Sequence, residues 1–346
     1  MTIVAAGGFV PREEDLIAIP VESLKANTPI NFDLFAGVQL NDASKTKDIV
    51  LYASAPTHWS YHEPAMLKKS GISSFFIRPD DRSRYQSYVA FNSHARKVDP
   101  NGTPEFRISQ IQDIGSHLME VCFHTGMDNL LLGRLDTVAD DIVHCLNDDP
   151  KAVVHIQNLV DHDMYTYFHS TGVGILSVAM AKALGENQPE VLRSFALGGL
   201  LHDIGKREIP KHVLNKNGPL TESEWKIMKE HPQSGFDHLK NTDIPQMVRD
   251  IVLYHHEKRD GSGYPHRLIA DQIPLPAQLV SIADMFNALT TTRSYHRKRS
   301  RFEALMLMKH DMGEKIWPEG FRALVAALCE GDSAADKDQI KMFSLP

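Results

Sequence analysis

Imidazole and carboxylate side chains recur through the second half of the chain, in segments with helical periodicity. They are His169, His202, Asp203, His231, His255, His256 and Asp284. Because they are spread over several segments, they can meet only if these helices bundle around a common point. Nitrogen and oxygen ligands without a thiolate suit a pair of first-row transition metals that activates water. The pattern therefore predicts a binuclear metal site and a metal-dependent phosphohydrolase.

Two doublets carry most of this prediction, because a single helical histidine is more often structural than a ligand. His202-Asp203 ends one apolar helical segment, and His255-His256 ends another. Burying such polar pairs costs several kcal/mol unless a metal or a hydrogen-bond network satisfies them. Neighbouring residues on a helix diverge by about 100°. Each doublet can therefore address two neighbouring positions, and Gly205 is expected to break the first helix beside a pocket.

Helical periodicity dominates the chain from residue 107 onward, which supplies the elements that must hold these side chains. Helices are expected at residues 107–124, 128–147, 150–162, 165–185, 188–202, 222–239, 244–256, 276–292, 300–312 and 318–330. Thr221 and Glu224 form a capping box at the start of one of them, and Pro189 fits the first turn of another. These segments predict an all-α bundle.

The first third of the chain has mixed signals. Short β-branched and aromatic runs at residues 49–52 and 74–77 predict strands, and residues 63–70 have helical character before Gly71. Residues 98–104 are rich in turn formers. The expected fold is therefore mainly α, with a C-terminal helical bundle preceded by a small α+β domain. The expected domains are a regulatory or dimerisation domain at 1–105, a helical stalk at 106–149 and the metal-bearing domain at 150–346.

Composition excludes several classes of protein. The chain has 346 residues with 42% hydrophobic and 23% charged residues, as in ordinary globular proteins. A net charge of −7 disfavours a nucleic-acid polymer or an anionic membrane as partner. Three widely spaced cysteines are expected to be small buried residues in a reducing compartment. With neither a signal peptide nor a long apolar run, a cytoplasmic protein is expected, and the stalk would allow a homodimer.

The order of the polar segments resembles a known family, the HD-GYP branch of the bacterial HD phosphohydrolases, which degrade cyclic dinucleotides. The matching segments are His202-Asp203-Ile204-Gly205-Lys206, Ile209-Pro210, Leu214 to Thr221, His231-Pro232 with Gly235, His255-His256-Glu257, Asp260 to Pro265, Ile273-Pro274, and Asp284 to Thr290 with Arg293. The resemblance covers about residues 150–346. It implies an HD-type helical bundle and cyclic di-GMP phosphodiesterase activity that gives linear pGpG, with further hydrolysis to GMP left open.

The resemblance also implies a role for each matching residue. His169 is similar to the first histidine ligand, and Asp203 to the carboxylate that bridges two metals. The remaining metal ligands would be His202, His231, His255, His256 and Asp284. Lys206, Tyr264 and Arg293 match positions that face the substrate phosphate or shape its pocket. The metals would be iron or manganese, although the ligand types alone also allow nickel and zinc.

Two positions depart from the family pattern. Tyr165 stands where members with three metals carry a glutamate, one helical turn before His169. Two divalent ions are therefore expected. Asn287 stands where the family has an aspartate. An amide can still orient a histidine ligand but supplies no charge, so metal affinity or preference would shift.

In the mechanism that the resemblance suggests, a metal-bridging hydroxide attacks phosphorus while Lys206 and Arg293 stabilise charge on the phosphate. Alternatives remain open. Lys206 could instead cap a helix, Arg293 could form a surface ion pair, and the loop around Tyr264 could be only a rigid turn. The substrate could be 3′,3′-cyclic GMP-AMP. The protein could also be a catalytically silent receptor for a cyclic dinucleotide, whereas a mononucleotide hydrolase would not need the Gly-Tyr-Pro loop.

Overall fold

The structure is a computed structural model of the 346-residue chain. It describes residues 12–25, 28–38, 48–58, 74–94, 98–156, 165–216, 218–291 and 299–331. The chain divides into two compact units, Met1–Arg96 with Glu120–Arg134, and Lys97–Met119 with Leu135–Pro346. Each unit is described by itself below, and the domain boundaries expected at residues 105 and 149 stay a prediction.

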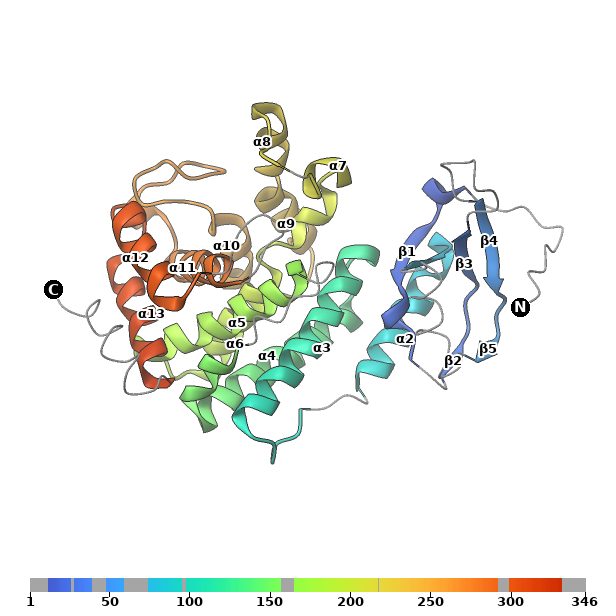
Figure 1. The fold of residues 1–346 in the computed structure, drawn as a ribbon, viewed down its shortest axis with the longest axis horizontal. Helices are drawn as coiled ribbons and strands as arrows, with labels where there is room; N and C mark the ends of the chain where they lie inside the picture. Colours follow the sequence, from blue (N-terminus) through green and yellow to red (C-terminus); the bar gives the residue numbers. More distant parts are fainter. Residues whose placement is uncertain are drawn as a thin grey trace. The chain divides into compact units, whose positions relative to one another are not determined.

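The first unit contains a small antiparallel sheet (Figure 1). Its strands are β1 (Ile17–Pro20), β2 (Pro29–Ile30), β3 (Leu34–Val38), β4 (Asp48–Ala53), β5 (Thr57–His58) and β6 (Ser74–Ile77). Four of them form a sheet in the order β1-β6-β3-β4, and β2 pairs with β5. β4 and β6 confirm the strands expected at residues 49–52 and 74–77.

Helix α2 (Arg82–His94) covers part of this unit and was not predicted from the sequence. Tyr85 and Tyr88 pack edge-on against Phe32, with ring centroids 5.6 and 5.7 Å apart. The helix has few apolar residues, so its stability depends on this tertiary packing rather than on periodicity. Short 3₁₀ helices lie at Glu13–Asp15, Val21–Ser23 and Pro79–Asp81. The helix expected at residues 63–70 lies outside the described residues.

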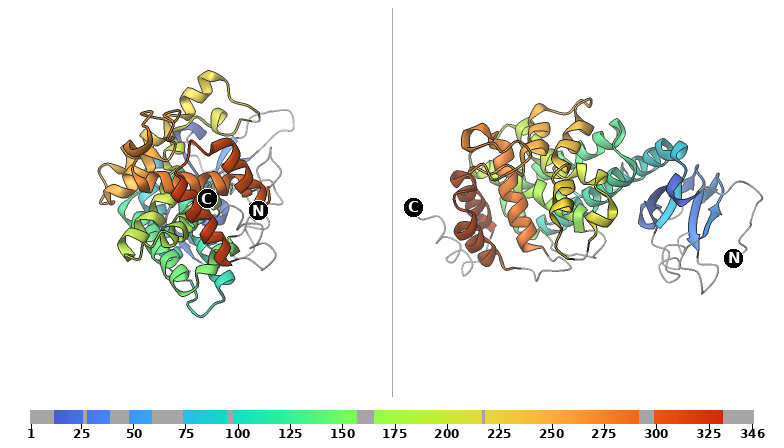
Figure 2. Two further views of the ribbon diagram at one scale, coloured as in Figure 1. Left: turned by 90° about the vertical axis from the view of Figure 1, so that its left-hand side faces the viewer. Right: turned by 90° about the horizontal axis from the view of Figure 1, so that it is seen from above.

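The remaining elements confirm the expected mainly α fold. They are α3 (Pro104–Thr125), α4 (Asn129–Asp148), η4 (Pro150–His155), α5 (Tyr165–Ala183), α6 (Pro189–Leu201), η6 (Ile204–Glu208), α7 (Lys211–Leu214), α8 (Glu222–Met228), α9 (His231–Leu239), α10 (Gln246–Tyr254), η7 (Ala270–Gln272), α11 (Leu275–Thr290), α12 (Arg301–Met312) and α13 (Pro318–Gly331). α5 packs against α6, α11 and α13 (Figures 1 and 2). It is buried on nearly all sides from His169 to Ala181, as expected of a central helix.

Two expected helices are wrong in extent. The helix expected at 222–239 is broken between α8 and α9, because Pro232 in the first turn of α9 has no N–H to continue the α8 hydrogen-bond ladder. Residues 150–155 form only a 3₁₀ helix, and residues 157–164 lie outside the described part. The capping box of Thr221 and Glu224 is confirmed. Pro189 indeed opens α6.

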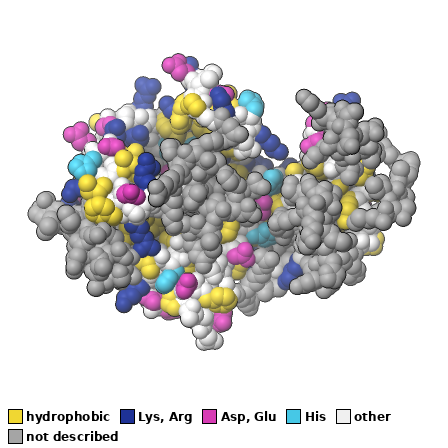
Figure 3. Space-filling model, viewed as in Figure 1, with side chains coloured by type: hydrophobic (Ala, Val, Ile, Leu, Met, Phe, Trp, Pro, Cys, Tyr) yellow, Lys and Arg dark blue, Asp and Glu magenta, His cyan; other side chains and the backbone are white. Residues whose placement is uncertain are grey.

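The surface carries both signs of charge. On the face drawn in Figure 3, acidic and basic side chains of the described residues are interspersed over the helices. Among the described helices, none combines the length and the apolar character needed to cross a membrane. Cys122 and Cys145 are buried as expected, whereas Cys329 is partly exposed.

Candidate metal centre

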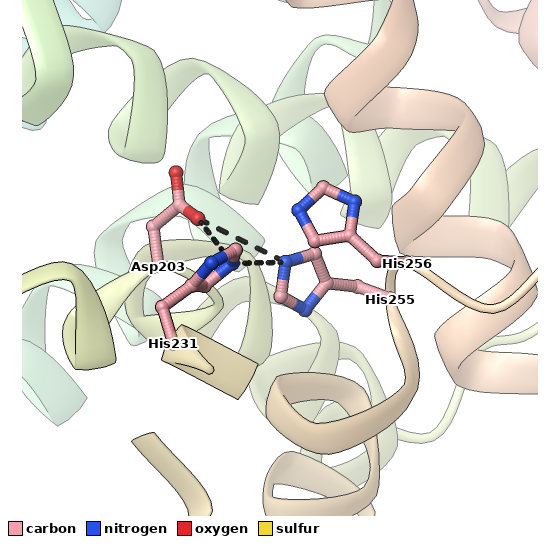
Figure 4. Close-up of side chains that lie close together, drawn as sticks. All are labelled: Asp203, His231, His255 and His256. Atoms are coloured by element: carbon pink, nitrogen blue, oxygen red, sulfur yellow. Dashed lines mark hydrogen bonds and ion pairs between the residues drawn. The ribbon is translucent and has the colours of Figure 1, made fainter. Parts of the chain in front are cut away.

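The ends of four helices and the middle of a fifth bring the seven predicted ligands together. They lie on α5 (His169), after α6 (His202 and Asp203), at the start of α9 (His231), after α10 (His255 and His256) and on α11 (Asp284). Potential ligand atoms of Asp203, His231, His255 and His256 lie within 4.8 Å of one another (Figure 4). Potential ligand atoms of His169, His202 and Asp203 also lie within 4.8 Å of one another. Asp203 therefore belongs to both groups.

Gly205 allows α9 to approach the end of α6. A Cβ atom on Gly205 would lie 1.9 Å from the carbonyl oxygen of His231 and 2.5 Å from the backbone nitrogen of Gly235. α6 already ends at Leu201, so Gly205 is not what breaks this helix, contrary to the expectation. Only a residue without a side chain fits between these backbones, and the contact places His231 beside Asp203.

Four of the histidines are oriented through Nδ1. Nδ1 of His202 lies 2.7 Å from the carbonyl oxygen of Gly199. Nδ1 of His231 lies 2.8 Å from the carbonyl oxygen of Met228, and Nδ1 of His255 lies 2.9 Å from that of Val252. Nδ1 of His169 lies 2.7 Å from Oδ1 of Asn287. A carbonyl oxygen can only accept, so Nδ1 carries the proton in each ring. In the neutral imidazoles, the lone pair is then on Nε2.

The Nε2 atoms of His202, His231 and His255 lie beside other acceptor atoms rather than beside hydrogen-bond donors. Nε2 of His231 and Nε2 of His255 are 3.4 Å apart, and neither carries a proton to donate when both rings are neutral. Nε2 of His202 and Oδ1 of Asp203 are buried without a hydrogen-bond partner among the described residues. Buried acceptors without donors are costly. Converging lone pairs of this kind fit a cation, so the donor set suits divalent metal ions.

The two carboxylate oxygens of Asp203 face different histidines. Oδ1 lies 3.3 Å from Nε2 of His231 and 3.8 Å from Nε2 of His255. Oδ2 lies 3.2 Å from Nε2 of His202 and 2.5 Å from Nζ of Lys206. Asp203 therefore stands between the two groups with one oxygen toward each, as a carboxylate shared by two metal ions must.

Asp284 lies beside the group formed by His169, His202 and Asp203. Its Oδ1 lies 3.0 Å from Nε2 of His169 and 4.0 Å from Nε2 of His202. One turn later on α11, Asn287 holds the opposite edge of the His169 ring, and Thr291 donates to Oδ1 of Asn287 at 3.3 Å. The amide thus orients a histidine, as the sequence suggested it could.

The electrostatic environment favours the protonation states that metal ligands need. Burial, together with the nearby His202 and His231, lowers the pKa of His255 to about 3. Burial and His255 also hold the pKa of His256 well below its usual value. Burial would raise the pKa of Asp203, but the charges of His202 and Lys206 outweigh it and hold this pKa well below its usual value. At neutral pH, His255 and His256 are therefore neutral and Asp203 is ionised.

Two further pKa values follow from the same charges. Burial opposes ionisation of Asp284, but the hydrogen bond and charge of His169 hold its pKa far below the usual range. Burial would lower the pKa of His202, but Asp203 and Asp284 raise it. The carboxylates thus remain charged, and their charge is what draws a cation to this pocket.

The loop after α10 places Tyr264 against the histidines. Its ring stacks on His256 with centroids 4.7 Å apart and an interplanar angle of 27°, and lies 6.3 Å from the His231 ring. Gly261 has a φ of 76°, and a Cβ on Gly263 would lie 2.4 Å from the nitrogen of Lys258. Positive φ and close backbone approach are the two conditions that glycine tolerates better than any other residue.

Glu257 anchors the same loop, a role that the sequence analysis did not assign. Its carboxylate accepts hydrogen bonds from the backbone N–H groups of His266 at 2.6 Å and Leu268 at 3.0 Å. The side chain is buried, with 3% of the residue exposed. An acidic residue directly after the His255-His256 doublet was the available signal, but its backbone partners could not be known without the loop conformation.

The structure therefore brings together all seven predicted ligands with Lys206 and Tyr264. Arg293 lies outside the described residues. α5 begins at residue 165, one turn before His169 as expected, but the side chain of Tyr165 is not described.

Comparisons with known proteins agree with this arrangement. The sequence model of the HD domain family matches residues 154–319. A cyclic di-GMP phosphodiesterase from Pseudomonas aeruginosa is 37% identical over 192 residues, which are 55% of this chain and 46% of that protein. A 3′3′-cGAMP-specific phosphodiesterase from Vibrio cholerae is 38% identical over 156 residues, or 45% of this chain and 36% of that protein. The chain spans about half or less of the length of these relatives.

A solved structure shares the fold over most of the chain. An HDG"Y"P protein from Bdellovibrio bacteriovorus superposes with a TM-score of 0.61 at 23% sequence identity. The match covers 90% of this chain and 98% of that one. At this identity the likeness establishes the fold alone.

Proposed function

Residues 154–319 match the sequence model of the HD domain family, and on that premise we propose that this chain is an HD-GYP protein and a metal-dependent phosphodiesterase acting on cyclic di-GMP. The product would be linear pGpG. The observation that carries the proposal is the position of Asp203, whose two oxygens face separate groups of histidines. A carboxylate with one oxygen toward each group can hold two metal ions a few ångströms apart, as a two-metal phosphohydrolase requires.

Two divalent ions fit the donor set, with iron or manganese favoured. One would be held by His169, His202, Asp203 and Asp284, and the other by Asp203, His231, His255 and His256. When bound, such ions supply an activated water and neutralise charge on the phosphate. Two ions rather than three are proposed, because residue 165 is a tyrosine and offers no carboxylate.

The chain's own side chains position the substrate. Lys206 is held at Asp203 and keeps 25% of its side chain exposed, so its ammonium can also meet a phosphate oxygen. There it would stabilise the charge that grows on the phosphate during attack. Tyr264 offers a ring face and a hydroxyl beside His256. We propose the same phosphate-facing role for Arg293.

The test is an anaerobic preparation, loaded with iron or manganese and assayed with cyclic di-GMP and with 3′,3′-cyclic GMP-AMP. His255→Ala serves as the control without a complete metal site. Release of pGpG by the wild-type protein and not by the variant is expected. Binding of either dinucleotide without hydrolysis in the metal-loaded protein would instead indicate a receptor. Lys206→Ala with unchanged turnover would remove this lysine from the mechanism.

3′,3′-Cyclic GMP-AMP is the second candidate substrate, because one of the relatives is specific for it. The two substrates differ only in one base, and both present the same phosphodiester to the metal centre. The ratio of kcat/KM for the two dinucleotides in the assay above decides between them.

A further inference from the structure

A hollow beside the metal centre is lined by positively charged side chains that have no role in the proposed catalysis. It has a volume of about 480 Å³. Its lining residues come from the end of α8 and from the loop after α10, and the charged ones are Lys226, Lys229, Glu230 and Arg267. Three of these side chains are positive and one is negative. The hollow therefore favours an anionic group.

Tyr264 connects this hollow to the metal centre. Its ring lines the hollow, stacks on His256 at 4.7 Å, and lies 5.6 Å from Nζ of Lys229. Whatever binds in the hollow is thus separated from a metal ligand by one aromatic ring.

Arg267 has an unusual backbone conformation at its position in the lining of the hollow. Its φ is 59°, in the left-handed region that arginine rarely adopts. The N–H groups on either side, those of His266 and Leu268, both donate to the buried carboxylate of Glu257. This pair of hydrogen bonds holds the turn that carries Arg267 into the lining of the hollow. Backbone strain of this kind is common at ligand-binding sites.

None of the three cations is engaged by an acidic side chain within the described part of the chain. Ion pairs are present nearby, such as Lys216 with Glu224 and Lys240 with Asp237. Lys226, Lys229 and Arg267 are instead exposed around the hollow. Their positive charges are available for a ligand.

We propose that this hollow binds the second phosphate of the cyclic dinucleotide, the one that is not hydrolysed, through Lys226, Lys229 and Arg267. The inference rests on the proposed function. A cyclic dinucleotide carries two phosphodiesters in one ring, so when one lies at the metal centre the other is held close to the surface beside it. Lysine and arginine side chains are the usual partners of phosphate oxygens.

Two substrates separate this subsite from the metal centre. Bis(4-nitrophenyl) phosphate has a single phosphodiester, so it needs only the metal centre, whereas cyclic di-GMP would use both. Three variants remove charge from the hollow: Lys226→Ala, Lys229→Ala and Arg267→Asn. Asparagine is chosen because it tolerates the left-handed backbone. Arg267→Lys keeps the charge, and Lys151→Ala removes an exposed lysine outside the hollow.

Each charge-removing variant should raise KM for cyclic di-GMP by about tenfold, the loss expected for one charge-assisted hydrogen bond. Turnover of bis(4-nitrophenyl) phosphate should stay within twofold of wild type, since no contact to it is lost. The effect on cyclic di-GMP should shrink at high salt, and Arg267→Lys should recover part of the affinity. Lys151→Ala should match wild type with both substrates.

An unchanged KM for cyclic di-GMP in all three variants would overturn the subsite. Equal losses of activity with cyclic di-GMP and with bis(4-nitrophenyl) phosphate would also overturn it, because they indicate a disturbed metal centre. Failure of the proposed function gives a different result, because the wild-type protein would then leave cyclic di-GMP uncleaved, whether or not it cleaves bis(4-nitrophenyl) phosphate. In that case the Kd of cyclic di-GMP, measured by equilibrium dialysis with the same proteins, decides the subsite. A Kd equal to wild type in the three variants overturns it.

Discussion

Nδ1 of His169 donates a hydrogen bond to Oδ1 of Asn287 over 2.7 Å, although the two residues are 118 positions apart. Both side chains are buried. The bond aims Nε2 of His169 at Asp284, 3.0 Å away. An amide on α11 thus fixes the geometry of a proposed metal ligand on α5.

Asn287→Ala should weaken metal binding, because the His169 ring loses the acceptor that orients it. Loss of such an outer contact costs about 10- to 100-fold in metal affinity. Asn287→Asp should retain or strengthen binding, since a carboxylate accepts the same hydrogen bond and adds charge. Competition with a chromophoric chelator measures both. Equal affinities for wild type and Asn287→Ala would show that the bond does not control the site.

Gly205→Ala should destabilise the protein and weaken the metal centre together. The added Cβ would meet the His231 carbonyl oxygen at 1.9 Å, so α9 must move and carry His231 away from Asp203. Overpacking of this kind costs about 1–3 kcal/mol in the free energy of unfolding. Urea titration and metal analysis measure the two effects. As a control, Gly133→Ala adds a Cβ in open space and should leave metal content unchanged.

The metal-free protein should lose stability as the pH falls below about 6.5, the usual histidine value. The folded-state pKa of His255 is about 3, so between these values the unfolded chain binds a proton that the folded protein does not. The free energy of unfolding then falls by up to about 1.4 kcal/mol per pH unit for this histidine. His256 acts in the same direction.

Urea titrations of the metal-free protein between pH 7 and pH 5 test this dependence. His255→Asn removes one titrating group and should show a shallower loss of stability than wild type. His202, with its raised pKa, contributes stability that is fully present below about pH 6.5 and is lost as the pH rises above it, so it does not mask the effect between pH 6.5 and pH 5. Identical slopes for wild type and His255→Asn would contradict the proposed protonation states.

Glu257→Gln should weaken binding of cyclic di-GMP without affecting the metals. The amide has one acceptor oxygen, so one of the N–H groups of His266 and Leu268 loses its partner, at a cost of about 1–3 kcal/mol. The turn that carries Arg267 then relaxes, and KM for cyclic di-GMP should rise while bis(4-nitrophenyl) phosphate is cleaved normally. Exposed Glu314→Gln is the control. A fall in metal content would assign Glu257 to the metal centre instead.

The sequence by itself determined which residues form the metal centre's ligand candidates. Buried His-Asp and His-His doublets at the ends of apolar segments are costly without a cation, and this reasoning applies without knowing the fold. Helical periodicity likewise predicted the mainly α architecture and the ends of most helices. Helix α2 was not predicted, because its stability depends on the packing of Tyr85 and Tyr88 against Phe32 rather than on a local sequence pattern.

Only the tertiary structure decided how these residues are used. It gave Asp203 one oxygen for each group of histidines, and it paired the His169 ring with Asn287. It also showed that Gly205 allows the backbone of α9 to approach closely and does not end α6. The cationic hollow around Arg267 depends on a loop turned back by Glu257, and such long-range geometry arises from contacts that sequence spacing does not encode.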